Sequence, residues 1–131
     1  MMRLLALDTS TEHMSVAVGR MGDDPPHVWC AQGVGGALAS GQLIPMVRAV
    51  LAQAGLVFAD LDAIVFGRGP GAFTGLRTAC AVAQGLALGA RPDSPMTSLP
   101  VLPFDSLLAV AEQARCRHAP DQPGWDVLAM L

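Results

Sequence analysis

The feature of this sequence that most constrains its fold is a glycine-rich segment, GRGPGAFTGLR, at residues 67–77. It follows the apolar run Ala63–Phe66 and leads into the small-residue run TACAVAQGLALGA at residues 78–90. Four glycines and a proline at this place predict a tight turn between a strand and a helix, with glycine supplying positive φ angles. A glycine-rich turn of this kind is also a common way to hold phosphate, so the segment has two interpretations.

Predicted strands and helices alternate along the chain in a pattern typical of an α/β domain. Short apolar runs separated by turn residues predict an antiparallel meander of strands over Arg3–Leu7, Met14–Val18 and His27–Gln32. Helical spacing predicts helices over 41–54, 75–88 and 106–115, with one strand at 63–66 and another within 91–103. The order β-β-β-α-β-α-β-α predicts a mixed sheet with helices packed on it.

Signals at the helix ends refine these boundaries. Pro45 must lie near the first turn of the helix at 41–54 or kink it, because proline lacks a backbone N–H. Gly55 is placed to end that helix, and Asp105 or Ser106 is placed to cap the helix at 106–115.

The length of 131 residues predicts one domain, which we place at residues 1–118. The run Trp125–Leu131 has the pattern of a strand that stops at the last residue. A fold rarely ends within a strand, so we expect this chain to be cut from a longer one.

The composition points to a partner surface rather than to nucleic acid. Hydrophobic residues make up 52% of the chain and charged residues only 15%, against a typical charged share of about 25%. The net charge is −3, lysine is absent, and the arginines are scattered, so no basic patch for RNA is predicted. No apolar run reaches the roughly 18 residues of a membrane span, and no signal peptide is visible, so we expect a cytoplasmic protein without membrane contact.

The glycine loop fits only part of the pattern of a nucleotide-binding turn. Gly67, Gly69 and Ala72 satisfy the relaxed dinucleotide fingerprint, and Asp93 follows at about the distance of the ribose-binding acid. That fingerprint belongs to the first βαβ unit, however, and this loop follows the fourth predicted strand. Pro70 removes one backbone N–H, and a Walker loop needs a lysine. A tight turn that lets the backbone approach a neighbour closely is the better interpretation.

A second candidate site follows the first predicted strand. Asp8, Thr9, Ser10 and Thr11 place a carboxylate at a strand end with hydroxyls in the next turn, a set that can hold Mg²⁺ and phosphate. Ordinary turn chemistry is the alternative, and spacing alone favours it. The histidines and cysteines are scattered without ligand spacing, and no serine lies in a nucleophile motif. We therefore predict no catalytic residue and no metal site.

The helix predicted at 75–88 carries small residues on two faces. The first face consists of Gly75, Ala79, Ala83 and Ala87, and much of the second of Thr78, Ala81, Gly85 and Gly89. Two small faces predict two closely packed neighbours: the sheet, and either the helix at 41–54 or a helix of another chain. The low charge favours another chain. The residues predicted at this partner interface are Met46, Val50, Arg68, Arg77, Thr78, Ala79, Val82, Ala83 and Leu86.

Two stretches together resemble a known family. LLALDTSTEHMSVAV at residues 4–18 and LDAIVFGRGPGAFTGLRTACAVAQGLALG at residues 61–89 are similar to the TsaB (YeaZ) family of bacterial tRNA threonylcarbamoyladenosine biosynthesis proteins. The resemblance covers about residues 2–90 and, more loosely, the helix at 106–115. It implies an actin/Hsp70-like fold of two ribonuclease-H-like halves, of which this chain would be the first. Residues 119–131 would then be a linker and the opening strand of a truncated second domain.

The resemblance also implies a function. Asp8, Thr9, Ser10 and Thr11 match the first phosphate loop of that fold, with Ser10 where glycine belongs, so we expect a vestigial loop and neither ATP nor Mg²⁺ as cofactor. Proteins of this family assemble and stabilise a TsaD-type transferase, with a TsaE-type ATPase, and are not themselves the transferase. We expect a homodimer when the chain is alone, and tRNA contact only through the complex. A nucleotide-binding ATPase domain and a glycoprotease-like peptidase are the alternatives.

Overall fold

The computed structural model describes residues 1–94, 97–122, 124, 126 and 128–130. Its main elements follow the predicted order. They are β1 (Met2–Asp8), β2 (His13–Met21), β3 (His27–Val34), α1 (Ala39–Ala54), β4 (Ala63–Gly67), α2 (Phe73–Gly89), β5 (Val101–Phe104) and α3 (Ser106–His118). The strand predicted at Trp125–Leu131 includes residues outside the described part, so the second domain stays a prediction.

The five strands form one mixed sheet in the order β3-β2-β1-β4-β5. The meander is confirmed, because β1 pairs antiparallel with β2 and β2 pairs antiparallel with β3. β4 and β5 then extend the sheet in parallel with β1. Parallel neighbours bring the carboxyl ends of β1, β4 and β5 to one edge, where Asp8, Gly67 and Phe104 lie.

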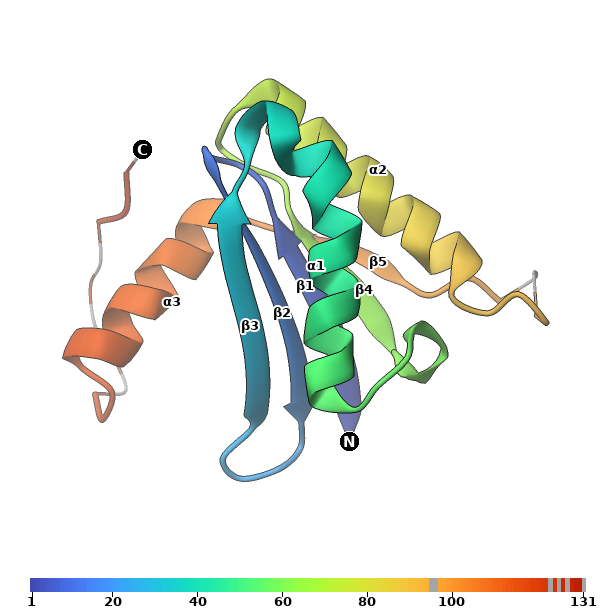
Figure 1. The fold of residues 1–131 in the computed structure, drawn as a ribbon. Coiled ribbons are helices and arrows are strands. Elements are labelled where there is room, and N and C mark those ends of the chain that lie inside the picture. The colour runs from blue at the N-terminus through green and yellow to red at the C-terminus, as the bar shows by residue number, and fades with distance from the viewer. Residues whose placement is uncertain (95–96, 123, 125, 127, 131) are drawn as a thin grey trace.

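The core lies between one face of the sheet and two helices, α1 and α2, which lie side by side in Figure 1. Strand residues alternate as a half-buried sheet requires: Leu5 and Leu7 of β1 are buried, and so are Met14, Val16 and Val18 of β2. The helices contribute a stripe of small and branched side chains, including Leu43, Val47, Val50, Ala83 and Ala87. α3 is separate from this pair and flanks the opposite face of the sheet.

The start of α1 differs from the prediction. A short 3-10 turn at Gly36–Leu38 leads into the helix, which therefore begins at Ala39 rather than Gly41. Pro45 consequently lies inside the helix, beyond its first turn, and the carbonyl of Gly41 loses its usual helical donor. Gly55 ends the helix as predicted, in the left-handed region at φ 66°.

Only one small face of α2 is packed within the chain. Gly75, Ala79, Ala83 and Ala87 are its buried residues, as the spacing predicted. Ala81, Gly85 and Gly89 on the other face are exposed, and a Cβ added at Gly85 or Gly89 would meet nothing within 4 Å. The second close neighbour predicted for this face is therefore not found in the described chain.

Among the described residues, no helix has the length and apolar character needed to cross a membrane.

Candidate functional site

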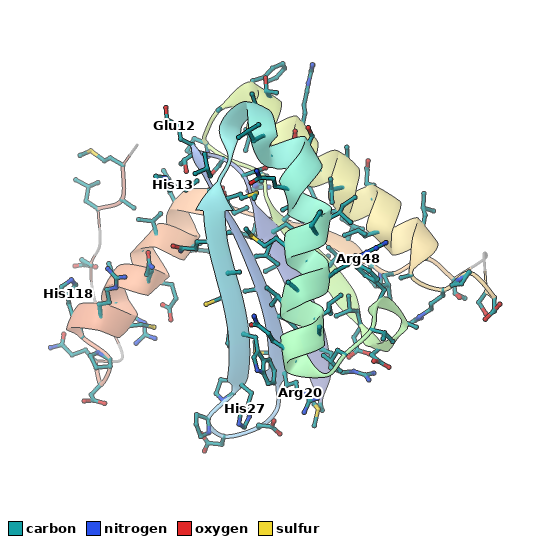
Figure 2. The ribbon with its side chains drawn as sticks, viewed as in Figure 1. Glu12, His13, Arg20, His27, Arg48 and His118 are labelled. Atoms are coloured by element: carbon teal, nitrogen blue, oxygen red, sulfur yellow. The ribbon has the colours of Figure 1, made fainter. Side chains whose placement is uncertain are left out.

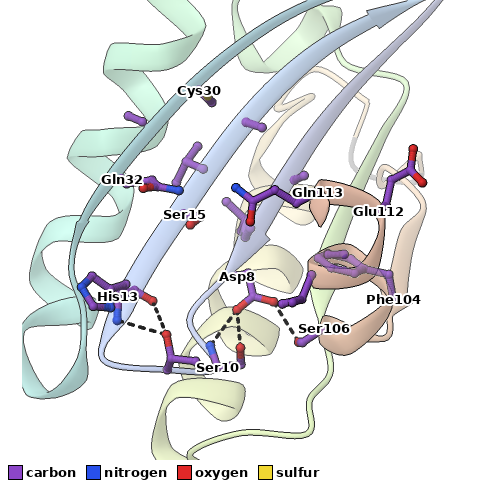
Figure 3. A pocket seen from close by; sticks show the side chains of 18 of the residues that line it. Asp8, Ser10, His13, Ser15, Cys30, Gln32, Phe104, Ser106, Glu112 and Gln113 are labelled. Carbon is purple, nitrogen blue, oxygen red and sulfur yellow. Dashed lines mark hydrogen bonds between the residues drawn. The ribbon is translucent and has the colours of Figure 1, made fainter. Parts of the chain in front are cut away.

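The site is built around Asp8, the last residue of β1. Oδ1 of Asp8 accepts hydrogen bonds from the backbone N–H of Ser10 at 2.8 Å and from the Ser10 hydroxyl at 2.6 Å. Oδ2 accepts one from the hydroxyl of Ser106, at the start of α3, at 2.8 Å. Figure 3 shows these bonds converging on the carboxylate. The carboxylate therefore joins the end of β1 to a residue 98 positions away in the sequence.

Ser106 extends this network to the glycine loop. Its hydroxyl oxygen accepts the backbone N–H of Gly69 at 3.3 Å, and its own N–H donates to the Gly69 carbonyl at 3.0 Å. Asp105 caps α3 as predicted, because its carboxylate accepts the N–H of Leu107 at 3.0 Å. The start of α3 is thus held between Asp8 and the glycine loop.

Three glycines of the loop are needed because residues 8–10 lie directly against them. A Cβ added at Gly67 would collide with the Asp8 carboxylate, one at Gly71 with the Ser10 carbonyl, and one at Gly75 with the Thr9 carbonyl. The predicted close backbone approach is confirmed, and the neighbour is the loop after β1.

Two further bonds join the same loops. The Ala72 N–H donates to the Ser10 carbonyl at 2.7 Å, and the Thr9 hydroxyl donates to the Gly75 carbonyl. Thr9 and Ser10 are both buried, whereas Thr11 is exposed and bonds only locally to His13.

These contacts test whether the predicted phosphate loop fits a nucleotide with Mg²⁺. Both Asp8 oxygens, which would face a hydrated metal, accept donors from the chain itself. The backbone N–H of Ser10 donates to Asp8, the Ser10 carbonyl accepts the N–H of Ala72, and the glycine loop lies directly against residues 8–10. Phosphate loops work by presenting free backbone N–H groups to open space. The residues present do not fit this cofactor.

A groove of about 680 Å³ opens beside Asp8, between the second face of the sheet and α3. Its sheet side includes Ala6, Ser15, Ala17 and Cys30, and its helix side includes Leu107, Val110 and Gln113. The walls are mainly apolar, and its charged residues are the carboxylates Asp8 and Glu112. Such a groove suits an apolar group rather than a phosphate.

Glu112 forms an ion pair with Arg115 one turn later on the exposed side of α3, at 2.7 Å. The hydrogen bond from Arg115, with a further one from Cys116, lowers the pKa of Glu112 to about 2 from its ordinary 4.5. Because the folded pKa is depressed, the pair stabilises the folded chain fully above pH 4.5, and this contribution is lost as pH falls toward 2.

Replacing Glu112 with Gln is therefore expected to remove an acid-dependent part of the stability. The difference in thermal midpoint between wild type and Glu112→Gln should be positive above pH 4.5 and should vanish near pH 2. Thermal unfolding followed by circular dichroism across this range measures it. Glu12→Gln is the matched control, because the Glu12 side chain makes no hydrogen bond in the described structure. A difference that does not vary with pH would contradict the role of the pair.

The predicted interface residues fall into two groups. Val50, Ala79 and Ala83 are fully buried in the chain's own core, so their side chains have no exposed surface for a partner in this structure. Small residues such as Ala79 and Ala83 allow a helix to pack closely on the sheet, just as they would allow it to pack on a partner helix. The sequence alone therefore does not separate the two. The remaining predicted residues have exposed or partly exposed surface and stay a prediction: Met46, Arg68, Arg77, Thr78, Val82 and Leu86.

Two structural features of the candidate site were not predicted from the sequence. Ser106 was considered only as a helix cap, and nothing in the sequence pairs it with Asp8. Phe73 was not chosen, although it is 68% exposed and the Arg77 guanidinium lies 4.0 Å from the centre of its ring. The i, i+4 spacing of these two residues on a helix was the available signal.

The titratable residues do not gather into a metal site in the part of the chain that is described. No group of three or more His, Cys, Asp or Glu side chains there could hold a metal ion. Figure 2 shows His13, His27 and His118 at three separate places.

Comparison with solved structures defines the class of this domain. The chain aligns with YeaZ from Pseudomonas aeruginosa at 42% identity and a TM-score of 0.74, over 92% of this chain and 51% of that one. RuvC from Thermus thermophilus shares the fold at 14% identity, with a TM-score of 0.51 over 90% of this chain and 72% of that one. The domain is therefore ribonuclease-H-like, of the actin/Hsp70-like superfamily, as the resemblance implied.

Sequence comparison gives the family. The model described as "TsaD: tRNA N6-adenosine threonylcarbamoyltransferase" matches residues 38–130. The chain belongs to this family, on its TsaB (YeaZ) branch. Relatives named "tRNA threonylcarbamoyladenosine biosynthesis protein TsaB" include one from Haemophilus influenzae, 43% identical over 85% of this chain and 42% of the relative. Another, from Escherichia coli, is 38% identical over 86% of this chain and 44% of the relative. The chain thus spans about half the length of these relatives.

Proposed function

We propose that this chain is a non-catalytic assembly subunit in the biosynthesis of threonylcarbamoyladenosine in tRNA. In this proposal it binds and stabilises a TsaD-type transferase through α1 and α2. The observation that carries it is the solvent-facing stripe of α2, which we call the outer stripe: Phe73, Arg77, Ala81, Gln84 and Leu88.

The outer stripe has the composition of a protein interface. Phe73 and Leu88 are 68% and 69% exposed, which leaves two large apolar side chains in water. Arg77 covers the ring of Phe73, and both aromatic residues and arginine are enriched at protein interfaces. Ile44 of α1, the helix next to α2, is also exposed. Burying these residues against a partner would remove apolar surface that the chain alone leaves exposed.

The proposal also covers the oligomeric state of the chain, its other partners and its location. The same stripe would support a homodimer when the chain is alone. A TsaE-type ATPase would act in the complex rather than on this subunit, and tRNA would be contacted through the complex, because a net charge of −3 disfavours direct binding. We place the protein in the cytoplasm with its tRNA substrate, and without a cofactor of its own.

Reversing the charge of Arg77 tests the outer stripe. Arg77→Glu is expected to weaken binding of the TsaD-type partner at least about tenfold, because arginine anchors at interfaces commonly contribute about 2 kcal/mol or more. The homodimer fraction should fall as well. Titration calorimetry measures the affinity, and sedimentation velocity measures the dimer.

The matched control is Arg117→Glu, which makes the same charge change on an exposed residue of α3, away from α2. It should change the affinity by less than about twofold, as rim and remote charges do. Equal affinity of both variants for the partner would rule out the outer stripe as the interface.

A further inference from the structure

We infer that Asp8 and Ser106 form an internal latch that closes the predicted phosphate loop on the chain itself, and that Asp8 is a positioning residue for the first turn of α2. The latch is the set of hydrogen bonds that Asp8 and Ser106 make to each other and to Ser10 and Gly69. The role in positioning rests on the proposed function, since it concerns the helix that would meet the partner.

The carboxylate of Asp8 is the centre of the latch. It is partly buried and has no cationic partner among the described residues, so neutral donors compensate its charge. The three donors are one backbone N–H and two hydroxyls, all from this chain. Hydrogen bonds to a charged group are the stronger kind, so the chain's own residues fill the positions that a ligand would use.

A short path of hydrogen bonds connects Asp8 to α2. Asp8 holds both the N–H and the hydroxyl of Ser10, and the Ser10 carbonyl accepts the N–H of Ala72, the residue that precedes α2. Ala72 has no capping side chain, so the start of this helix relies on such outside contacts. Two hydrogen bonds thus lead from Asp8 to Ala72, and Phe73 of the outer stripe is the next residue, with Arg77 one helical turn later.

A second path passes through the glycine loop. Ser106 is 6% exposed and bonds Gly69 through both its N–H and its hydroxyl. Gly69 has φ 105°, a conformation that side chains rarely adopt and glycine adopts readily, so the two bonds to Ser106 are what hold this turn. The loop that leads into α2 is therefore held from two sides, by Ser10 after β1 and by Ser106 at the start of α3.

Hydrogen exchange on the full chain tests the latch without any partner. Asp8→Ala and Ser106→Ala should accelerate exchange of the Gly69 and Ala72 amides about tenfold or more, while amides of β2 and β3 change little. Thr11→Ala is the control, since it removes an exposed hydroxyl of the same loop, and it should leave these amides unchanged. If Asp8→Ala does not fold, Ser106→Ala carries the test alone: it removes the hydroxyl that donates to Asp8 and accepts the Gly69 N–H, so faster exchange should appear at Gly69.

Millimolar MgATP added to the wild-type chain should change neither this exchange nor the thermal midpoint. Protection of the Gly69 amide by MgATP would overturn the inference, because it would show a site open to the ligand. Exchange in Asp8→Ala and Ser106→Ala that matches Thr11→Ala would overturn it too.

A double-mutant comparison tests the positioning role. If Asp8 acts through the first turn of α2, Asp8→Ala should weaken partner binding, and adding it to Arg77→Glu should cause little further loss. General destabilisation would instead give additive losses, which would overturn the positioning role. Failure of Arg77→Glu alone would count against the proposed interface, whereas the exchange result depends on no partner, so the two failures can be told apart.

Discussion

Replacing Gly75 with Ala is expected to destabilise the chain by about 3 kcal/mol, the upper range for forcing an added methyl group into a packed site. The reason is the Thr9 carbonyl oxygen, which occupies the place of the new Cβ. This oxygen belongs to the backbone beside β1, so it cannot move aside as the end of a flexible side chain could. Helix propensity alone predicts the opposite, because alanine is favoured over glycine in a helix by about 1 kcal/mol.

Gly85→Ala on the same helix is the control. A Cβ there meets nothing within 4 Å, so only the helix propensity acts, and the variant should be more stable by about 0.5–1 kcal/mol. Urea unfolding of both variants measures the two free energies. Effects of the same sign would show that the close approach of the Thr9 loop to α2 is not as tight as the structure has it.

The glycine loop was only partly predictable from the sequence. Its composition predicted a close approach of backbone to backbone, and that is confirmed. It could not show that the neighbour is Thr9 and Ser10, since the Thr9–Gly75 contact spans 66 residues and depends on β1 and β4 pairing in parallel. Local pattern specifies a strand or a helix, whereas such a contact appears only after the sheet has formed.

The fold was predictable where each element carries its own periodicity. Alternation in β2 and helical spacing in α1 and α2 placed these elements within a few residues. The predicted start of α1 was two residues late, because Pro45 was expected near the first turn of the helix. The 3-10 turn at Gly36–Leu38 instead leads into a helix that begins at Ala39. The second small face of α2 was predicted to pack on a close neighbour, but it is exposed to solvent. Small residues give the same sequence pattern in both cases.

The site around Asp8 was only half predictable. Its carboxylate and hydroxyls were visible as a turn after a strand, and turn chemistry was the favoured reading. The bond from the Ser10 hydroxyl to Asp8 is of this local kind. Ser106 carries no comparable sign, since a serine at the start of a helix is common, and its role comes from the position of α3 beside β1.

Replacing Ala83 with Arg is expected to cost about 3–5 kcal/mol, the cost of an uncompensated buried charge. Ala83 is 0% exposed and belongs to the core between α2 and the sheet. Domains of this kind are stable by about 5–15 kcal/mol, so the variant should lose a large part of its folded population well below the wild-type melting temperature. Thermal unfolding followed by circular dichroism measures the shift.

Ala81→Arg, two residues earlier on the exposed side of α2, is the matched control and should change the midpoint little. The pair also separates folding from binding. Loss of partner binding in Ala83→Arg would say nothing about the interface, because the helix itself would be displaced. Loss in Ala81→Arg with an unchanged thermal midpoint would instead locate the partner on the outer stripe. A thermal midpoint of Ala83→Arg equal to that of Ala81→Arg would contradict the buried placement of this residue, and with it the packing of α2 on the sheet.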